Sequence, residues 1–432
     1  MVPTGDPEQS AALAILPSGP LRGELRAPSS KSMTNRLLVI GALAEGRSRL
    51  ANPLVSDDTT VMAAALSDLG AETSLGEQQA TIAGSGGMLR RPRGVLWAGL
   101  SGTTLRYLCG LSLLVDGPVT LDGEPPLRRR PLGGLIAALE AAGADVVAAD
   151  QRAPLTISGA GIAGGRLVVD AGASSQFATA LLLVAPYARK DVELEIRNLS
   201  APGYVELTVD AMRRYGAAVE EVGPFHYRIA HSQRYGGRKD AVEYDASAAA
   251  HLFALAMATG GSVTVENAVS TRQPDAGILR IFEEMGAGIS ASTGPVTVRR
   301  GGLLRGIDTD LSTMPDQVAT LAVLGALADG PTLLTGIGVV RGHETDRIAA
   351  LEGELSKLGA AVEAGPDWLR VEGGRQLHGG RVDTHDDHRL AMAFTALGAV
   401  VEGIEIASPG CVAKTYPRWW DDAAALGLRL GG

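Results

Sequence analysis

A short glycine motif recurs at regular intervals along the chain. In each copy a glycine follows an amphipathic stretch and precedes residues that favour β-strands, as in Ala142-Gly143-Ala144-Asp145. The six glycines are Gly70, Gly143, Gly216, Gly286, Gly359 and Gly427, and the intervals between them are 73, 73, 70, 73 and 68 residues. A glycine in this position is typical of a helix that ends and turns into a strand. The regular period therefore predicts one structural unit repeated six times.

Each interval accommodates the same succession of elements. A strand, a helix, a second strand and a second helix come before the glycine, and short strands follow it. Residues 132–141 are one of the helical stretches, and residues 362–371 are one of the β-rich stretches. The pattern predicts an α/β protein built from six βαβ-containing repeats.

A domain boundary is predicted between the third and fourth repeats. Residues 231–240 are polar, contain two glycines and lack apolar periodicity. A chain of 432 residues is long enough for two large domains, so three repeats per domain is the natural division. The residues before Pro28 form only part of a strand region.

The first predicted helix begins in a stretch that suits an anion. Pro28 disfavours helix and serines follow it, so Ser30 or Ser32 is expected near the helix N-terminus. Unpaired backbone N–H groups and the positive end of the helix dipole attract phosphate or carboxylate there, and Lys31 and Arg36 add two positive charges. From this stretch alone, an ordinary capped helix with two solvated basic residues is an equally good interpretation.

Polar or charged residues also precede the other apolar, alanine-rich helices. These starts are Ser101-Gly102-Thr103, Ser174-Ser175-Gln176, Asp245-Ala246-Ser247, Pro315-Asp316 and Asp387-His388-Arg389. The basic residues in such loops are Lys31, Arg36, Arg106, Arg130, Arg347, Arg389 and Lys414. Singly, each is typical of a solvated surface charge or ion pair. Their shared position favours a local anion site, for which arginine is well suited.

Two acids lie in similar positions. Asp316 follows Pro315 at a helix start, and Glu344 lies in the segment from Arg341 to Arg347. Asp316 could be a helix cap, and Glu344 could belong to a local ion-pair network. Histidines of this segment and of Asp387-His388-Arg389 show no metal-ligand spacing, so neither a metal nor another cofactor is predicted.

Bulk composition restricts the classes of partner. The formal net charge is −9, from 39 basic and 48 acidic residues, which disfavours nucleic acid and anionic membranes as partners. No apolar run approaches the ~18 residues of a membrane span, and the first ten residues lack the basic start of a signal peptide. With only two cysteines, Cys109 and Cys411, a reducing compartment, the cytoplasm, is expected.

The helix-start motifs together resemble the 5-enolpyruvylshikimate-3-phosphate (EPSP) synthase family from about Leu21 to Leu428. The matching motifs are Ser30-Lys31-Ser32 with Asn35-Arg36, Ser101-Gly102-Thr103 with Arg106, Gly123-Glu124-Pro125 with Arg130-Pro131, Ser174-Ser175-Gln176-Phe177, Pro315-Asp316, Glu344-Thr345-Asp346-Arg347, Asp387-His388-Arg389 and Ala413-Lys414-Thr415. The resemblance implies a two-domain inverse α/β barrel of six βαβαββ repeats, with the active site in the interdomain cleft. It also implies that residues 29–243 form one domain and residues 1–28 and 244–432 a discontinuous second domain. A monomer is expected.

The resemblance further implies the transfer of the enolpyruvyl group from phosphoenolpyruvate to the 5-hydroxyl of shikimate 3-phosphate, with release of phosphate. The residues implied to bind shikimate 3-phosphate are Lys31, Ser32, Arg36, Ser174, Ser175, Gln176, Asp316 and His343. Those implied to bind phosphoenolpyruvate are Lys31, Gly102, Arg130, Gln176, Arg347, Arg389 and Lys414. Asp316 would take the proton of the hydroxyl, while Glu344 with Lys31 would deliver and later remove a proton at the methylene carbon.

Some positions depart from the family pattern. His343 stands where a lysine is usual, and Leu100-Ser101 precedes Gly102 where the family usually has Asn-Ala. The glycine itself matches the herbicide-sensitive pattern, so inhibition by glyphosate is expected. One alternative is the UDP-N-acetylglucosamine enolpyruvyl transferase of the same fold, although residues 122–134 lack the cysteine which that enzyme uses. A non-catalytic anion-binding protein of this fold is a second alternative.

Overall fold

The computed structural model describes residues 12–159, 161–269, 271–291 and 294–431, and the chain divides into two compact domains. Domain I consists of Ser29–Asp245 and Arg272–Pro274, and domain II of the residues up to Pro28, Ala246–Thr271 and Asp275–Gly432. The division after Asp245 lies two residues beyond the boundary expected from the sequence. Arg272–Pro274 also belongs to domain I, and Arg272 Nη1 lies 2.6 Å from Asp210 Oδ1 of that domain.

Domain I is built from three four-stranded sheets within the described residues. In spatial order they are β14 (Lys239–Ala241), β3 (Arg47–Ala51), β5 (Gln79–Ala83) and β4 (Glu72–Leu75); β6 (Leu96–Trp97), β7 (Gly117–Asp122), β9 (Leu155–Gly159) and β8 (Asp145–Ala148); and β10 (Gly165–Asp170), β11 (Val192–Arg197), β13 (His226–Ile229) and β12 (Val219–Gly223). The helices are α1 (Lys31–Leu43), α2 (Asp57–Asp68), α3 (Gly102–Ser112), α4 (Pro125–Arg128), α5 (Gly133–Ala141), α6 (Gln176–Val184) and α7 (Gly203–Arg214).

Domain II has the same composition of sheets in its described part. Its sheets are β16 (Ala287–Ala291), β17 (Val296–Arg300), β15 (Ser262–Val265) and β2 (Arg22–Leu25); β18 (Asp308–Asp310), β19 (Pro331–Thr335), β21 (Trp368–Glu372) and β20 (Ala361–Ala364); and β22 (Gly380–Val382), β23 (Ile404–Ile406), β1 (Leu13–Leu16) and β24 (Arg429–Gly431). The α-helices are α8 (Ala246–Thr259), α9 (Ile278–Glu284), α10 (Val318–Leu327), α11 (Arg347–Lys357), α12 (His388–Gly398) and α13 (Trp419–Ala425). Three 3₁₀ turns bear on the site: η5 (Pro315–Gln317), η6 (Gly338–Gly342) and η7 (Pro409–Lys414).

All six sheets share one pairing scheme, which confirms the predicted sixfold repeat. In the third sheet of domain I, β10 pairs in parallel with β11, and β13 then pairs antiparallel with both β11 and β12. Helices α6 and α7 connect these strands, so the repeat reads βαβαββ. The six repeat glycines end their helices as expected, because all adopt the left-handed conformation, with φ of 104, 104, 95, 106, 96 and 101° in chain order.

Some sheets include a strand from a distant part of the sequence, so the repeats are not a simple tandem array. The opening strand of the first sheet is β14, which follows the third repeat and pairs in parallel with β3. The strand before α1 is β2, which pairs in parallel with β15 of domain II, while β1 pairs with β23 and β24. The segment before Pro28 therefore completes two sheets of domain II.

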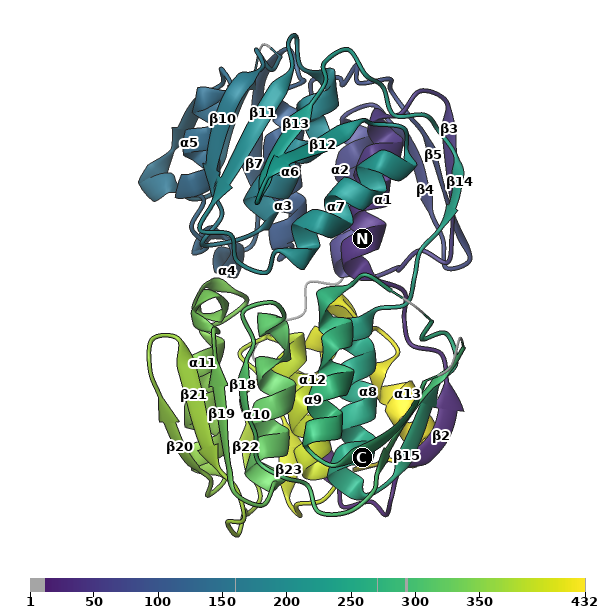
Figure 1. Cartoon of the computed structure of the whole chain (residues 1–432), viewed down its shortest axis with the longest axis vertical. Coiled ribbons are helices and arrows are strands. Elements are labelled where there is room, and N and C mark those ends of the chain that lie inside the picture. The colour runs from purple at the N-terminus through teal and green to yellow at the C-terminus, as the bar shows by residue number, and fades with distance from the viewer. Residues whose placement is uncertain (1–11, 160, 270, 292–293, 432) are drawn as a thin grey trace. The chain divides into compact units, whose positions relative to one another are not determined.

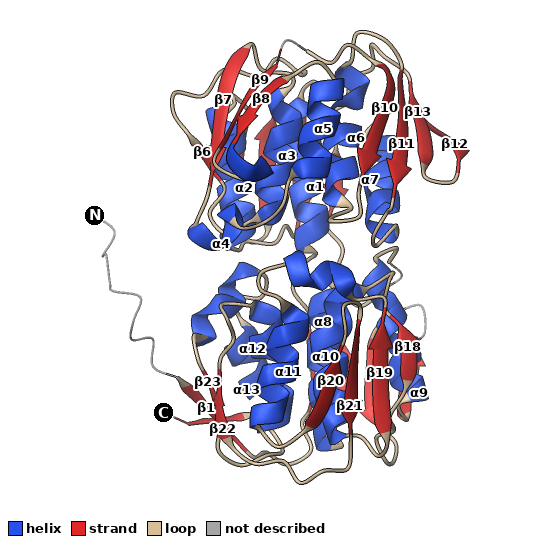
Figure 2. Ribbon diagram, turned by 90° about the vertical axis from the view of Figure 1, so that its left-hand side faces the viewer, coloured by secondary structure: helices blue, strands red, loops and turns tan. Residues whose placement is uncertain are grey.

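Within each domain the helices are gathered inside and the strands lie outside them (Figures 1 and 2). Helix α8 is buried along its whole length, and α12 and α3 are buried at every residue. Such close packing needs small side chains. A Cβ at Gly110 of α3 would lie 2.3 Å from the carbonyl oxygen of Ala180 in α6. The inner helices thus present their N-terminal residues at one end of each domain.

Candidate active site

The first turn of α12 places an acid inside domain II. Asp387 is the N-cap of this helix, and its side chain accepts a hydrogen bond from the backbone N–H of Arg389 at 2.9 Å. The same carboxylate is completely buried and accepts from Arg347 Nε at 2.7 Å and Arg347 Nη2 at 3.2 Å. One aspartate therefore both caps α12 and orients an arginine of α11.

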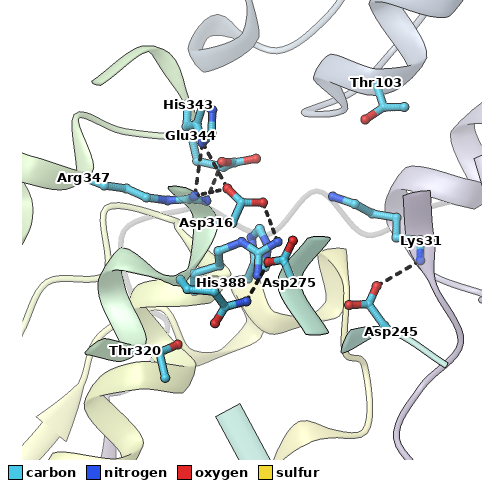
Figure 3. Close-up of polar contacts among 12 residues, drawn as sticks. Lys31, Thr103, Asp245, Asp275, Asp316, Thr320, His343, Glu344, Arg347 and His388 are labelled. Atoms are coloured by element: carbon cyan, nitrogen blue, oxygen red, sulfur yellow. Dashed lines mark hydrogen bonds and ion pairs between the residues drawn. The ribbon is translucent and has the colours of Figure 1, made fainter. Parts of the chain in front are cut away.

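Arg347 is the first residue of α11 and the centre of a charged cluster (Figure 3). Besides Asp387, its guanidinium donates from Nη1 to Asp316 Oδ1 and from Nη2 to Glu344 Oε2, each at 2.7 Å. Its side chain is only 1% exposed. Burial alone lowers the pKa of the guanidinium, but the three carboxylates outweigh it and raise that pKa above its usual range. Arg347 is therefore permanently charged and held on three sides.

Two more cations contact the second carboxylate oxygen of Asp316 and of Glu344. Arg389 Nη2 donates to Asp316 Oδ2 at 2.7 Å, and Lys414 Nζ lies 2.8 Å from Glu344 Oε1. Arg389 lies on α12 and Lys414 ends η7, so four segments contribute to the cluster. We call the acids Asp316, Glu344 and Asp387 with the cations Arg347, Arg389 and Lys414 the acid–cation cluster. Its formal charges cancel, three against three.

Asp316 and His343 form a pair at the edge of this cluster. His343 Nδ1 lies 3.2 Å from Asp316 Oδ1 and 3.1 Å from Arg347 Nη1. Burial alone raises the pKa of Asp316, but the charge of Arg389, the hydrogen bond with His343 and the charge of Arg347 hold that pKa well below its usual range. Burial lowers the pKa of His343 below its ordinary 6.5. At neutral pH Asp316 is therefore a carboxylate and His343 a neutral imidazole.

In domain I, the start of α1 holds the lysine that the sequence singled out. Ser30 is the N-cap and accepts from the backbone N–H of Met33 at 3.2 Å. The backbone N–H of Lys31 donates to Asp245 Oδ2 at 3.1 Å, and its Nζ lies 3.0 Å from Asp58 Oδ2 (Figure 3 shows the first contact). The expected cap is therefore Ser30, and two aspartates fix Lys31 at both ends.

The starts of α3 and α6 meet in a second group of domain I. Arg106 Nη1 donates to Gln176 Oε1 at 2.7 Å, and Gln176 Nε2 donates to Thr103 Oγ1 at 3.1 Å. Arg130 is buried beside Gly102, where an added Cβ would lie 2.5 Å from Arg130 Nη1. The glycine thus leaves room for the guanidinium.

Two more predicted residues of domain I, Ser174 and Arg36, make hydrogen bonds within that domain. Ser174 Oγ accepts from the backbone N–H of Gln176 at 3.2 Å, and Ser174 and Ser175 are both buried. Arg36 donates to Thr208 Oγ1 and to the carbonyl oxygens of Ser32 and Tyr204. The guanidinium of Arg36 therefore supports the packing of α1 against α7.

The predicted site residues are divided between the two domains. Domain I contains Lys31, Ser32, Arg36, Gly102, Arg130, Ser174, Ser175 and Gln176, and domain II contains Asp316, His343, Glu344, Arg347, Arg389 and Lys414. Sequence reasoning assigned no role to Asp58, Asp245 or Asp387. All three lie at or beside helix starts, which is the signal that would have found them.

The described residues contain no group of three or more histidine, cysteine and carboxylate side chains that could hold a metal ion. Both cysteines are free thiols, and Cys109 is buried in α3. In the ranges that the structure covers, every helix is too short or too polar to cross a membrane.

The arrangement of helix starts and charged residues agrees with comparisons against known proteins. Residues 15–423 match the family model of EPSP synthase (3-phosphoshikimate 1-carboxyvinyltransferase). The chain belongs to the EPSP synthase family. A 3-phosphoshikimate 1-carboxyvinyltransferase of Methanoculleus marisnigri is 41% identical to it over 416 residues, which cover 95% of this chain and 98% of the relative. One of Nostoc punctiforme is 38% identical and covers 93% of this chain and 95% of its own.

Solved structures of the EPSP synthase family have the same fold. The EPSP synthase of Acinetobacter baumannii superimposes with a TM-score of 0.82 at 25% identity, over 97% of this chain and 99% of that one. Because the likeness extends over both domains, it supports the two-domain α/β fold of six repeats. The relatives named here support the EPSP synthase reading over that of the UDP-N-acetylglucosamine enzyme.

Proposed function

We propose that this EPSP synthase family member transfers the enolpyruvyl group of phosphoenolpyruvate to the 5-hydroxyl of shikimate 3-phosphate and releases phosphate. The match to 3-phosphoshikimate 1-carboxyvinyltransferases over nearly the whole chain supports this reaction. The observation that carries the chemistry is Arg347, which holds both candidate proton-transfer acids, Asp316 and Glu344, at 2.7 Å.

The acid–cation cluster suits a small, highly charged anion such as phosphoenolpyruvate. Its three cations are buried and currently bound to the cluster's own carboxylates. We infer that the carboxylate and phosphate of phosphoenolpyruvate take over contacts of Arg347, Arg389 and Lys414. Asp316 and Glu344 would then be released from part of their ion pairs and become available for proton transfer.

Domain I supplies the second set of residues. Its buried serines and amide side chain, Ser174, Ser175 and Gln176, suit the hydroxyls and phosphate of shikimate 3-phosphate, together with Ser32 and Arg36. Gly102 and Arg130 would contact phosphoenolpyruvate, and Lys31 and Gln176 would contact both substrates. We propose that the two sets act on the same pair of substrates, as the family resemblance implies.

The proposed reaction proceeds by addition and elimination. Asp316 takes the proton of the 5-hydroxyl, whose oxygen attacks the enol carbon, while Glu344 with Lys31 delivers a proton to the methylene carbon. The resulting tetrahedral ketal loses phosphate when Glu344 removes a proton from the new methyl group. The cations align the reactants and stabilise the charge that develops on the phosphate.

Phosphate release from phosphoenolpyruvate tests the proposal directly. We expect release with shikimate 3-phosphate as acceptor and none with UDP-N-acetylglucosamine. Release only with UDP-N-acetylglucosamine would identify the other transferase. Release with neither acceptor, from protein that binds phosphoenolpyruvate, would favour a non-catalytic anion-binding protein.

We also propose a monomeric, cytoplasmic enzyme. The net charge of −9 and the two free thiols support this setting. Sedimentation equilibrium tests the monomer, because a dimer would double the apparent mass.

A further inference from the structure

His343 has a partner for its Nδ1 atom in either protonation state. Arg347 Nη1 lies 3.1 Å from Nδ1 and can only donate, so it suits a neutral ring with its lone pair on that nitrogen. Asp316 Oδ1 lies 3.2 Å from the same nitrogen and can only accept as a carboxylate, so it suits a protonated ring. One ring nitrogen can therefore gain and lose a proton without losing its hydrogen bond.

Several neighbouring elements contribute charged groups around His343. Asp316 on η5, Glu344 in the same segment and Arg347 on α11 face the ring, while Arg389 and Lys414 hold the far oxygens of the two acids. The two carboxylates favour the imidazolium, whereas burial and Arg347 disfavour it. Burial is the largest of these effects, so the pKa of the ring stays below its ordinary 6.5. Asp316, held by two arginines, retains a proton poorly.

We propose that His343 accepts, through Nδ1, the proton that Asp316 removes from the acceptor hydroxyl. The inference rests on the proposed function and adds a positioning and proton-storing residue to it. The O–H bond of the hydroxyl breaks, and its oxygen uses the electron pair to bond the enol carbon. The proton passes to Asp316 and then across the 3.2 Å contact to Nδ1, which restores the carboxylate. The imidazolium releases its proton to water when product leaves.

The first test needs no turnover. Protein labelled with ¹³C at the histidine rings is titrated by NMR, and the His343 signal is the one lost in His343→Gln but kept in the surface control His378→Gln. We expect His343 to titrate below pH 6.5, and to titrate lower still in Asp316→Asn because a carboxylate that favours the imidazolium is gone. The proposal would be overturned if the His343 ring titrates at or above pH 6.5, or if its pKa is the same in Asp316→Asn as in the wild type.

The second test is the pH dependence of kcat. In the wild type, kcat should fall at low pH as His343 becomes protonated, because a protonated ring cannot accept the proton from Asp316. His343→Gln should lose this acidic limb and lower kcat at neutral pH by about 10- to 100-fold, a larger change than that in KM for shikimate 3-phosphate. His378→Gln should keep the wild-type profile. If His343→Gln retains both kcat and the limb, the proposal is wrong.

The two tests separate this inference from the proposed function. A wild-type protein that releases no phosphate with shikimate 3-phosphate contradicts the function, whereas the NMR titration still reports on the His343–Asp316 contact. Should His343→Gln fold poorly, His343→Asn serves as the second variant, because it also lacks a titrating nitrogen.

Discussion

At the scale of single residues, Arg347 has no good substitute. Its planar guanidinium makes hydrogen bonds with three carboxylates from one buried position. A lysine ammonium is a compact point charge and cannot match that geometry. The side chain of Arg347 thus helps to orient all three carboxylates.

Replacing Arg347 by lysine should therefore lower both activity and stability. We expect kcat/KM for phosphoenolpyruvate to fall by at least about 100-fold, or about 3 kcal/mol, since bidentate contacts are lost. Initial rates and urea unfolding measure the two effects. The control is Arg341→Lys, which affects a more exposed pair with Asp346. Wild-type kinetics in Arg347→Lys would remove Arg347 from the centre of the site.

Glu344→Gln should separate binding from catalysis. The amide keeps the shape of the side chain but cannot deliver a proton to the methylene carbon. We expect kcat to fall by about 10²- to 10⁴-fold while shikimate 3-phosphate still binds, as calorimetry can show. Glu352→Gln, on helix α11 that follows Glu344, is the matched control. Full turnover in Glu344→Gln would contradict the assigned role.

Sequence reasoning found most residues of the cluster but not their connections. Asp316, Glu344 and Arg347 stand out because they lie at a helix start or in the segment just before one. Asp387 was visible in the same pattern, yet its contact with Arg347 spans 40 residues and depends on how α11 and α12 pack. Contacts of this kind are set by tertiary structure, which local periodicity does not encode.

At the scale of elements, helix starts carry both stability and chemistry. Asp387 caps α12 and neutralises Arg347 with the same carboxylate. Ser30 caps α1 immediately before Lys31. Because a cap fixes the first turn, each of these side chains also fixes the direction of the charged residue that follows.

Asp387→Asn should destabilise domain II. Asparagine can still cap the helix, but Arg347 loses a buried negative partner, which typically costs about 3 kcal/mol in free energy of unfolding. Chemical denaturation measures the loss. Asp383→Asn provides the comparison, because Asp383 is exposed. Equal stabilities of the two variants would show that the Arg347–Asp387 contact contributes little.

Gly102→Ala should weaken phosphoenolpyruvate binding without unfolding α3. The new methyl group would lie 2.5 Å from Arg130 Nη1, so the guanidinium must move. We expect KM for phosphoenolpyruvate to rise about tenfold and inhibition by glyphosate to weaken, with shikimate 3-phosphate binding kept. Gly94→Ala, where a Cβ meets nothing within 4 Å, is the control. An unchanged KM in Gly102→Ala would exclude this contact.

Element order was also only partly predictable. The glycine spacing indicated the six repeats and their helix ends, and the pairing of strands bears this out. The origin of β14 as the opening strand of the first sheet was not predictable, because β14 and its neighbour β3 are separated by three repeats. A strand of three residues has too little periodicity to reveal its partner.

At the scale of the whole molecule, burying the helices places polar side chains deep inside each domain. His251 on α8 is fully buried, with its ring edge-on to Trp419 and its Nδ1 3.2 Å from Thr320 Oγ1. Burial, together with the charges of Arg389 and Arg347, holds the pKa of His251 well below 6.5. Folding therefore keeps this ring neutral where the unfolded chain would protonate it.

Stability should consequently fall as pH drops below 6.5. Below pH 6.5 the unfolded state binds a proton at His251 that the folded state excludes. The stabilisation by the buried neutral ring is therefore fully present above pH 6.5 and declines below it. Each pH unit below that point costs about 1.4 kcal/mol at most. Urea unfolding followed by tryptophan fluorescence at pH 7.5 and 5.5 should show the loss. The loss of stability between pH 7.5 and 5.5 should be smaller in His251→Phe and unchanged in His378→Gln. If His251→Phe loses as much stability as the wild type, other groups cause the loss.

The most direct measurement is the reaction run in D₂O, with phosphoenolpyruvate and shikimate 3-phosphate and the product observed by NMR. Addition of a solvent-derived deuteron to the methylene carbon makes a CH₂D group that can rotate. Removal of either of its two protium atoms, rather than the deuteron, then leaves deuterium in the vinyl group. We therefore predict an enolpyruvyl ether of shikimate 3-phosphate that carries deuterium at its methylene carbon, in step with the phosphate released. An enolpyruvyl product without deuterium would contradict the proton transfer assigned to Glu344. If no enolpyruvyl product forms at all, the proposed function itself is contradicted.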